Sequence, residues 1–347
     1  MNRNYRFIDL FCGIGGFHYA MKTATNANKD IAKCVFSSEI DSHCQISYET
    51  NFGFKPSGDI TKIEAKNIPD HDILLAGFPC QPFSIIGDMK GFNDTRGTLF
   101  FDIARILSEK KPQAFVLENV KLLVGHNRGQ TMRKIMKTLN DLNYNVSFKI
   151  LNAINFGLPQ KRERVFIVGL KDNLNFEWPK ENIKMKSLDD ILEENVSEKY
   201  YASEKIVNKR LAKKDKPNGT TIWHENIAGN IGIYPYSCAL RAGASYNYLL
   251  VNGERRLTER EMLRLQGFPE EFKIVCNYTQ TRKQAGNSLP IPVASSVLTN
   301  LISALNNENV YTHRIIDKQI YLLEKEANEY GTAQVKKRRK IRTTLST

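Results

Sequence analysis

The stretch that decides the fold lies near the N-terminus and reads Tyr5-Arg6-Phe7-Ile8-Asp9-Leu10-Phe11-Cys12-Gly13-Ile14-Gly15-Gly16-Phe17. Its first half is a short apolar run typical of a strand buried in a sheet. Its second half is a glycine-rich turn that opens a helix, which lets the backbone approach a ligand and point amide N–H groups at it. This order predicts an α/β fold with a ligand at the turn. A tight turn with a purely structural role is the alternative, because such turns are weak signals alone.

Apolar runs alternate with helix-like segments from residue 5 to about residue 170, the pattern of a parallel sheet covered by helices. We expect strands at residues 5–10, 34–38, 73–76 and 115–117. A helix with one buried face is expected from the spacing of Leu99, Ile103, Ile106 and Leu107. Glu39 follows the second strand, about where an acid binds ribose hydroxyls in nucleotide-binding folds, and Asp41 is the rival candidate.

The composition changes after Gly169, so we expect a domain boundary near Lys171. Regular structure is predicted to return at Thr258, which caps a short helix and forms a capping box with Glu261. A last helix is expected after Pro290, capped by Asn287 or Ser288. Its apolar stripe is Ile291, Ala294, Leu298, Leu301 and Leu305.

The chain is basic, with 50 Lys and Arg against 37 Asp and Glu and a formal net charge of +13. This balance favours a polyanionic partner. Part of the excess lies in the C-terminal tail, where a solvated, disordered end is the simpler interpretation. The six cysteines form no C-x-x-C pair and no zinc-like spacing, so neither disulfides nor a metal site are expected. Without a signal-like N-terminus or a run of roughly 18 apolar residues, we expect a cytoplasmic protein with no membrane span.

The sharpest chemical signal is the loop Gly77-Phe78-Pro79-Cys80-Gln81-Pro82-Phe83-Ser84, directly after the third predicted strand. Prolines on both sides hold Cys80 outside any helix or strand ladder. A lone cysteine is usually a small buried residue, but Glu118 closes the fourth strand, and the carboxyl ends of parallel strands face one crevice. A thiolate and an acid are therefore expected to share a cleft. The alternative for Glu118 is a surface charge at a strand end.

The order of motifs resembles that of the bacterial DNA (cytosine-5) methyltransferases of Type II restriction-modification systems. The matching segments cover about residues 5–305, apart from a variable region. In chain order they are Asp9-Leu10-Phe11-x-Gly13-x-Gly15-Gly16, Glu39, Gly58-Asp59-Ile60, Pro79-Cys80-Gln81, Thr95-Arg96-Gly97-x-Leu99-Phe100, Glu118-Asn119-Val120, Gln160-Lys161-Arg162-Glu163-Arg164, Arg256-Leu257-Thr258 to Gln266-Gly267-Phe268-Pro269, and Gln284-Ala285-Gly286-Asn287-Ser288.

The resemblance implies a Rossmann-like S-adenosylmethionine-dependent methyltransferase domain with a smaller, irregular target-recognition domain. The catalytic domain would be discontinuous, at residues 1–171 and 285–308. Residues 172–255 would read the DNA, residues 256–284 would form a hinge segment, and residues 309–347 would form a basic tail.

The resemblance also implies the chemistry. Cytosine C5 is a poor nucleophile, so Cys80 would add to C6, Glu118 would supply an acid at N3, and Arg164 would stabilise charge near O2. Arg162 would support this arrangement, and both arginines would lower the pKa of the thiol. The target base would be flipped out of the duplex. A solvated basic turn is the alternative for residues 160–164.

For the cofactor, the resemblance implies that Phe17 and Ile40 sandwich the adenine, Glu39 binds the ribose and Asp59 meets the exocyclic amine. Core packing is the alternative for Phe17 and Leu99, and a helix cap for Asn287. The complete expected set is Phe11, Gly13, Gly15, Gly16, Phe17, Glu39, Ile40, Asp59, Ile60, Pro79, Leu99, Asn287 and Ser288.

The partner implied is double-stranded DNA, with a companion restriction endonuclease acting on the same site, and the enzyme would be a monomer. Residues 218–252 would read the sequence, with Ser84 as a further DNA contact. Arg241 is the candidate for a guanine contact, against a phosphate contact or plain surface charge. The aromatic and polar candidates in that segment are Trp223, Tyr234, Tyr236, Tyr246, Asn247 and Tyr248.

Three rival functions remain. A tRNA cytosine-5 methyltransferase of the same fold shares the motif order. A nucleotide-dependent oxidoreductase would explain the glycine-rich turn and Glu39, but not Cys80, Glu118 and Arg164. A catalytically silent DNA-binding module would leave the nucleophile and the acid without a role.

Overall fold

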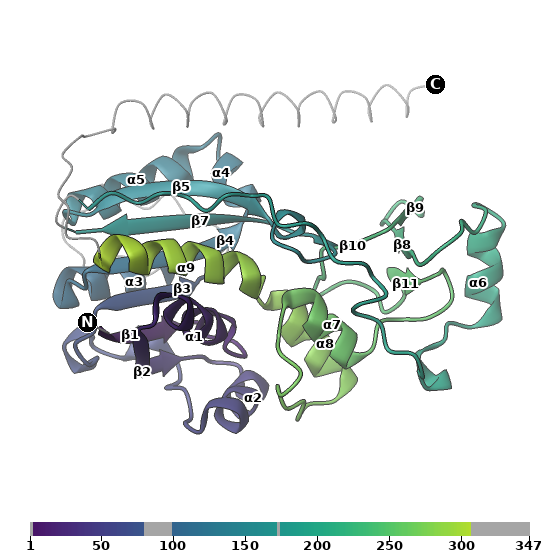
Figure 1. Ribbon diagram of the computed structural model, residues 1–347, viewed down its shortest axis with the longest axis horizontal. Helices are drawn as coiled ribbons and strands as arrows, with labels where there is room; N and C mark the ends of the chain where they lie inside the picture. The colour runs from purple at the N-terminus through teal and green to yellow at the C-terminus, as the bar shows by residue number, and fades with distance from the viewer. Residues whose placement is uncertain (1–2, 80–98, 172–173, 307–347) are drawn as a thin grey trace.

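The computed structural model describes residues 3–79, 99–171 and 174–306 (Figure 1). Cys80 and Ser84 lie outside the described residues. The strands are β1 (Asn4–Leu10), β2 (Ile31–Ser38), β3 (Ile73–Gly77), β4 (Ala114–Val120), β5 (Asn145–Asn152), β6 (Gln160–Lys161), β7 (Glu163–Leu170), β8 (Ile222–Glu225), β9 (Ile231–Tyr234), β10 (Ser237–Cys238) and β11 (Leu249–Val251). The α-helices are α1 (Gly16–Asn28), α2 (Ser42–Phe52), α3 (Leu99–Lys110), α4 (Leu122–Gly125), α5 (Gln130–Asp141), α6 (Glu204–Leu211), α7 (Glu259–Gln266), α8 (Tyr278–Asn287) and α9 (Ile291–Asn306). Short 3-10 helices are η1 (Ile60–Lys62), η2 (Ala65–Asn67), η4 (Ala153–Asn155) and η5 (Glu198–Tyr200).

The main sheet has six strands in the order β2-β1-β3-β4-β7-β5. The four strands expected from sequence are all present, and they pair in parallel. Strands β5 and β7 complete the sheet and were not foreseen. Because β7 runs antiparallel to both β4 and β5, the sheet is mixed rather than parallel. A short connection without a crossover helix links β5 to β7, and such a link suits only an antiparallel pair.

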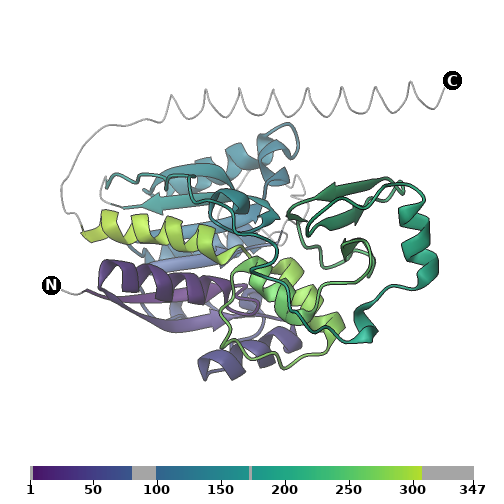
Figure 2. The ribbon, with the colours of Figure 1, turned by 45° about the vertical axis from the view of Figure 1, so that its right-hand side comes forward.

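Helices cover both faces of this sheet (Figures 1 and 2). Successive side chains of β1 point to opposite faces, so Phe7 joins one core and Ile8 the other. Helices α1 and α9 pack on the Phe7 side, and α3 and α5 pack on the Ile8 side. The predicted apolar face of α3 is buried at Ile103, Ile106 and Leu107.

Helix α9 brings the end of the described chain back to its beginning. It lies beside α1 in both views (Figures 1 and 2), and its predicted apolar stripe is buried. The Arg3 guanidinium donates to the carbonyl of Leu305, at 2.8 Å, and the Tyr5 hydroxyl donates to Asn306, at 2.8 Å. Residues from both ends of the motif order therefore belong to one core.

The predicted cap of this helix is wrong. Asn287 is the last residue of α8, and the amide of Ser288 donates to Gln284 within that same helix. The first turn of α9 instead starts at the Pro290 carbonyl, which accepts from Ala294. Proline suits this start because a helix leaves the amides of its first turn without partners inside the helix.

One stretch, Tyr278–Asn306, meets the length and composition of a membrane span, contrary to the expectation from sequence. An 18-residue window within it has a mean hydropathy of 1.4, yet 61% of that window is buried within the protein. It consists of α8 and α9 with a break between them. Its burial is that of a core element.

A smaller, less regular lobe projects from the sheet (Figure 2). It contains the antiparallel sheet β11-β8-β9 and helix α6. Trp223 is completely buried in it, as is the guanidinium-bearing side chain of Arg210. Strand β10 pairs with β6, which joins this lobe to the end of the main sheet.

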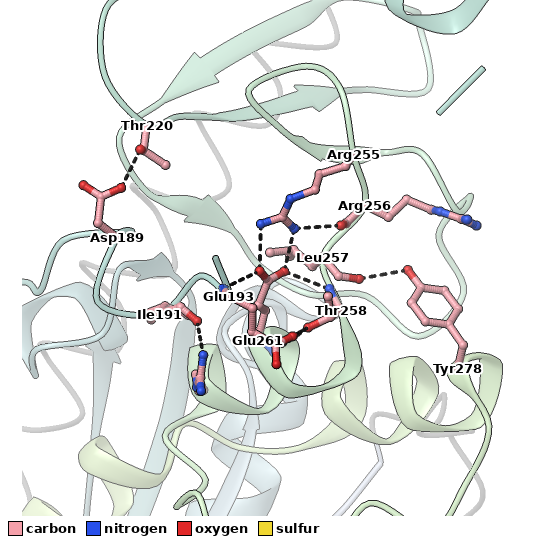
Figure 3. Close-up of polar contacts among 11 residues, drawn as sticks. Asp189, Ile191, Glu193, Thr220, Arg255, Arg256, Leu257, Thr258, Glu261 and Tyr278 are labelled. Carbon is pink, nitrogen blue, oxygen red and sulfur yellow. Dashed lines mark hydrogen bonds and ion pairs between the residues drawn. The ribbon is translucent and has the colours of Figure 1, made fainter. Parts of the chain in front are cut away.

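The chain segments that run between the two lobes meet at one buried carboxylate, that of Glu261 in α7 (Figure 3). Arg255 donates to both of its oxygens, at 2.8 and 2.9 Å. The amides of Glu193 and Thr258 donate as well, so the outgoing and returning segments bind one group. The predicted capping box of Thr258 and Glu261 is confirmed.

We predict that Glu261→Gln lowers the free energy of unfolding by about 3 kcal/mol, because removing one charge of a buried pair leaves the other uncompensated. Urea denaturation would measure the loss. Glu270→Gln is the matched control, since the Glu270 pair with Arg264 is exposed and should contribute less than about 1 kcal/mol. Equal losses in the two variants would contradict this role for Glu261.

Candidate active site

A cavity of about 660 Å³ opens at the carboxyl ends of β1, β2, β3 and β4. Ligands of open α/β sheets bind at this edge. The glycine-rich turn forms one wall, residues after β2 and β3 form the next, and the end of α8 closes the far side. Its volume is within the range of small-molecule sites.

The glycine-rich turn is held by Glu39. The Gly13 amide donates to one carboxylate oxygen of Glu39, at 2.9 Å, and the Asp41 amide donates to the other, at 2.8 Å. Each carboxylate oxygen keeps one lone pair for a further donor. Glu39 is therefore fixed at the cavity wall with acceptor capacity left.

Gly15 belongs to this turn but does not line the cavity. Its φ of 88° is a left-handed conformation that favours glycine. A Cβ at this position would lie 2.1 Å from the ring of Phe52. That ring stacks on His18 of α1, with centroids 4.0 Å apart.

Two further acids border the cavity. Asp41 caps α2 and forms an ion pair with Lys283 of α8, at 2.7 Å, which ties the two sides of the cavity together. The Asp59 carboxylate accepts from the amide and the hydroxyl of Thr61. These hydrogen bonds lower the pKa of Asp59, which keeps the carboxylate ionised.

Glu118 and Arg164 form a buried ion pair inside the cavity. They come from adjacent strands, β4 and β7, and the Arg164 Nε lies 2.9 Å from Oε1 of Glu118. Burial raises the pKa of Glu118, and the nearby charges of Arg164 and Arg162 oppose that rise. The pair places an acid with a raised pKa and a guanidinium in one cleft.

Arg162 is buried behind this pair rather than in the cavity. Its guanidinium donates to three backbone carbonyls, those of Leu240, Gly286 and Ser288, at 2.9, 2.9 and 2.6 Å. Gln160 is also buried and donates to the carbonyl of Leu265. The interpretation of residues 160–164 as a solvated turn is therefore wrong, and Arg162 joins three chain segments.

The loop that carries Cys80 begins at this cavity. Phe78 and Pro79 line it, at the end of β3. In the register of the sheet, Gly77 lies opposite Glu118. The loop therefore leaves the sheet next to the Glu118–Arg164 pair.

The C-5 cytosine-specific DNA methylase family model matches residues 5–303. The chain belongs to this family. Type II methyltransferase M.NgoBI of Neisseria gonorrhoeae is 56% identical over 292 residues, which cover 83% of this chain and 90% of that protein. Type II methyltransferase M.HaeII of Haemophilus aegyptius is 54% identical over 308 residues, covering 88% and 95%. The crystal structure of S. pombe Dnmt2 methyltransferase, 24% identical, has the same fold with a TM-score of 0.68 over 87% of this chain and 99% of that one. The protein is therefore a DNA cytosine-5 methyltransferase.

Almost all the residues that the sequence analysis expects to bind the cofactor lie at the cavity. Those that line it are Phe11, Gly13, Gly16, Phe17, Glu39, Ile40, Asp59, Ile60, Pro79, Leu99, Asn287 and Ser288. Only Gly15 among them lies outside the lining. Sequence reasoning missed Cys12, Cys44 and Gln284, which also line the cavity. Gln284 belongs to one of the matching motifs, whereas no residue pattern marks Cys12 or Cys44 as a cavity residue.

The DNA-reading candidates divide by exposure. Trp223 and Tyr248 are buried, so neither offers a free ring to a base. Arg241 is exposed, and its guanidinium lies 5.0 Å from the centroid of the Tyr248 ring. The adjacent backbone packs on the cavity wall, because a Cβ on Gly286 would lie only 2.5 Å from the amide nitrogen of Ala242. The candidate reading segment and the cavity thus share a wall.

We predict that His18 makes the methylase less stable as the pH drops from 6.5 toward 4. Burial lowers the pKa of His18 to about 4, whereas its value in the unfolded chain is near 6.5. In this range the unfolded state binds a proton that the folded state excludes, which costs up to roughly 3 kcal/mol of stability. His18→Phe keeps the ring stack on Phe52 and removes the titration.

Thermal unfolding between pH 7.5 and about 4 would measure this effect. The variant should lose less stability than the wild type over that range, even if it is less stable at pH 7.5 because the Tyr48 hydroxyl loses its bond to His18. The same pH slope in both proteins would exclude His18 as the source.

Proposed function

We propose that the protein transfers a methyl group to C5 of a flipped-out cytosine in double-stranded DNA through a covalent bond between Cys80 and C6. The observation that carries this proposal is the buried Glu118–Arg164 pair beside the start of the Cys80 loop. In this proposal the thiolate forms the S–C6 bond, and the C5=C6 and C4=N3 electrons shift until N3 takes up a proton. C5 then becomes nucleophilic enough to accept the methyl group.

Glu118 and Arg164 act at different atoms of the pyrimidine ring. A carboxyl group with a raised pKa can donate a proton to N3 and take it back later. The Arg164 guanidinium stabilises the negative charge that develops near O2. After methyl transfer, loss of the C5 proton to a base and cleavage of the S–C6 bond release the product and restore the thiolate.

Arg162 supports this site without touching the base. Its three carbonyl partners include Ser288 at the cavity and Leu240 next to the candidate reading segment. Its charge also opposes the rise in the pKa of Glu118. It is a positioning residue.

S-adenosylmethionine is the methyl donor that the family uses, and the cavity residues suit it. The lone pairs left on Glu39 can accept the two ribose hydroxyls, while Phe17 and Ile40 offer apolar surfaces to the adenine. Asp59 stays ionised and can accept from an exocyclic amine. When bound, this cosubstrate supplies a methyl group on a positively charged sulfur.

We propose that residues 172–255 form the target-recognition domain and that residues 1–171 and 285–308 form the catalytic domain. Residues 256–284 would be the hinge segment, and residues 309–347 a basic tail. The exposed Arg241 next to the cavity wall is the candidate for a guanine contact. The enzyme would act as a cytoplasmic monomer and protect DNA from a companion endonuclease that cuts the same site.

Cys80→Ala is expected to reduce methyl transfer by at least about 10³-fold, because the covalent route is lost. The affinity for duplex DNA should change little, since binding does not require the S–C6 bond. Labelled methyl incorporation into duplex DNA and a binding titration would measure the two. Cys34→Ala, a change in β2 outside both the cavity and the candidate reading segment, is the control.

Transfer by Cys80→Ala at the wild-type rate would refute covalent catalysis through this residue. The same assay with tRNA in place of DNA tests the alternative substrate, which should receive no label. Bisulfite sequencing of DNA from cells that express the enzyme would identify the cytosine modified.

A further inference from the structure

Asn119 holds the point at which the loop carrying Cys80 leaves the sheet. It follows Glu118 in β4 and is buried, with 3% of its surface exposed. Its side-chain amide donates to the carbonyl of Phe78, at 2.9 Å. Its side-chain oxygen accepts from the amide of Val120, at 2.7 Å. Both ends of the side-chain amide are therefore engaged. If the amide were reversed, its oxygen would face the Phe78 carbonyl and its NH2 group would face the Val120 amide, so the side chain has one orientation.

This contact extends the link between the two strands beyond their last paired residues. Strands β3 and β4 pair as far as Gly77 opposite Glu118, and Phe78 and Asn119 are the next residues on the two strands. At that point the backbone carbonyl of Phe78 accepts from the side chain of Asn119. The first residue of the loop is therefore bonded to the end of β4.

Phe78 is fixed from its other side as well. The residue is 3% exposed, and the centroid of its ring lies 6.0 Å from that of Phe100 of α3. The backbone and the ring of this residue are therefore both held, one by Asn119 and one by the core. Pro79, which follows, is exposed and lines the cavity.

We propose that Asn119 is a positioning residue for the nucleophile. Cys80 is the second residue after Phe78, and consecutive Cα atoms are about 3.8 Å apart, so the place of Phe78 limits where the thiol can act. Because Asn119 directly follows Glu118, one strand end holds both the acid and the anchor of the loop. The inference rests on the proposed role of Cys80 as the nucleophile.

The test compares Asn119→Asp and Asn119→Ala with the wild type. Asp has the same shape and keeps the acceptor for Val120, but it has no donor for the Phe78 carbonyl. Ala removes both bonds. A misplacement of the nucleophile by about 1 Å can cost about 10²-fold in rate, so we expect kcat to fall by about 10²-fold in both variants. Asn119 also lines the cavity, but its side-chain amide is already bonded to Phe78 and Val120. KM for S-adenosylmethionine should therefore stay within about threefold, because Glu39 and the glycine-rich turn are unchanged.

A second measurement reports on the loop itself. In the presence of S-adenosylmethionine, duplex DNA with 5-fluorocytosine at the target traps the enzyme. After methyl transfer C5 carries a methyl group and fluorine, so no proton can be removed there and the S–C6 bond persists. The rate of trapping should fall with kcat in both Asn119 variants. Asn145→Ala, which removes an exposed side-chain bond far from the cavity, is the matched control and should trap at the wild-type rate.

The outcomes separate the two proposals. Normal trapping and kcat in Asn119→Asp, with a folded protein by thermal unfolding, would overturn the positioning role and leave the role of Cys80 intact. Absence of trapping in the wild type, or trapping in Cys80→Ala, would overturn the covalent mechanism. A fall in cofactor affinity equal to the fall in kcat would show that Asn119 supports the cavity as a whole and would overturn the specific role.

Discussion

The parallel pairing of β3 with β4 is the constraint on which the site depends. Parallel strands end at the same edge, and the register sets Gly77 opposite Glu118. An acid and the first residues of the loop that carries Cys80 are therefore brought together by backbone hydrogen bonds of the sheet. The antiparallel strand β7 then starts at this same edge, where Arg164 lies opposite Val120. Because β7 runs antiparallel to β4, its first residues lie at the carboxyl end of β4, and this puts Arg164 beside Glu118.

Buried side-chain bonds to backbone carbonyls hold the parts of the molecule that the sheet does not reach. Arg162 binds three carbonyls, and Asn119 binds one at the end of β3. Each such donor would be costly if left unpaired in the interior. The segments they join must consequently keep their places for the protein to be stable. The same reasoning applies to the carboxylate of Glu261, whose four hydrogen bonds join the segments between the lobes.

Much of this arrangement could be predicted from the sequence. The four parallel strands are short apolar runs in the sequence, which is the strongest local signal of a buried strand. They lead to the glycine-rich turn, Glu39, Cys80 and Glu118. Strands β5 and β7 were missed because their partners are set by long-range pairing. The cap of α9 was assigned wrongly because Asn287 and Ser288 have side chains that suit a cap, whereas the chain uses them to end α8. Burial of Trp223 was also beyond the sequence, since aromatic residues serve cores and binding surfaces alike.

The packing of α9 beside α1 has a consequence for how the gene could be rearranged. The Arg3 and Tyr5 side chains bind the last turn of α9, so the two ends of the described fold are neighbours. A short linker could join them, and new termini could be opened at an exposed turn of the smaller lobe such as the one at Ile227, which is 99% exposed. Chains whose ends meet tolerate such circular permutation because no core contact has to be broken. A permuted order of the motifs along the chain is therefore compatible with the contacts of this fold.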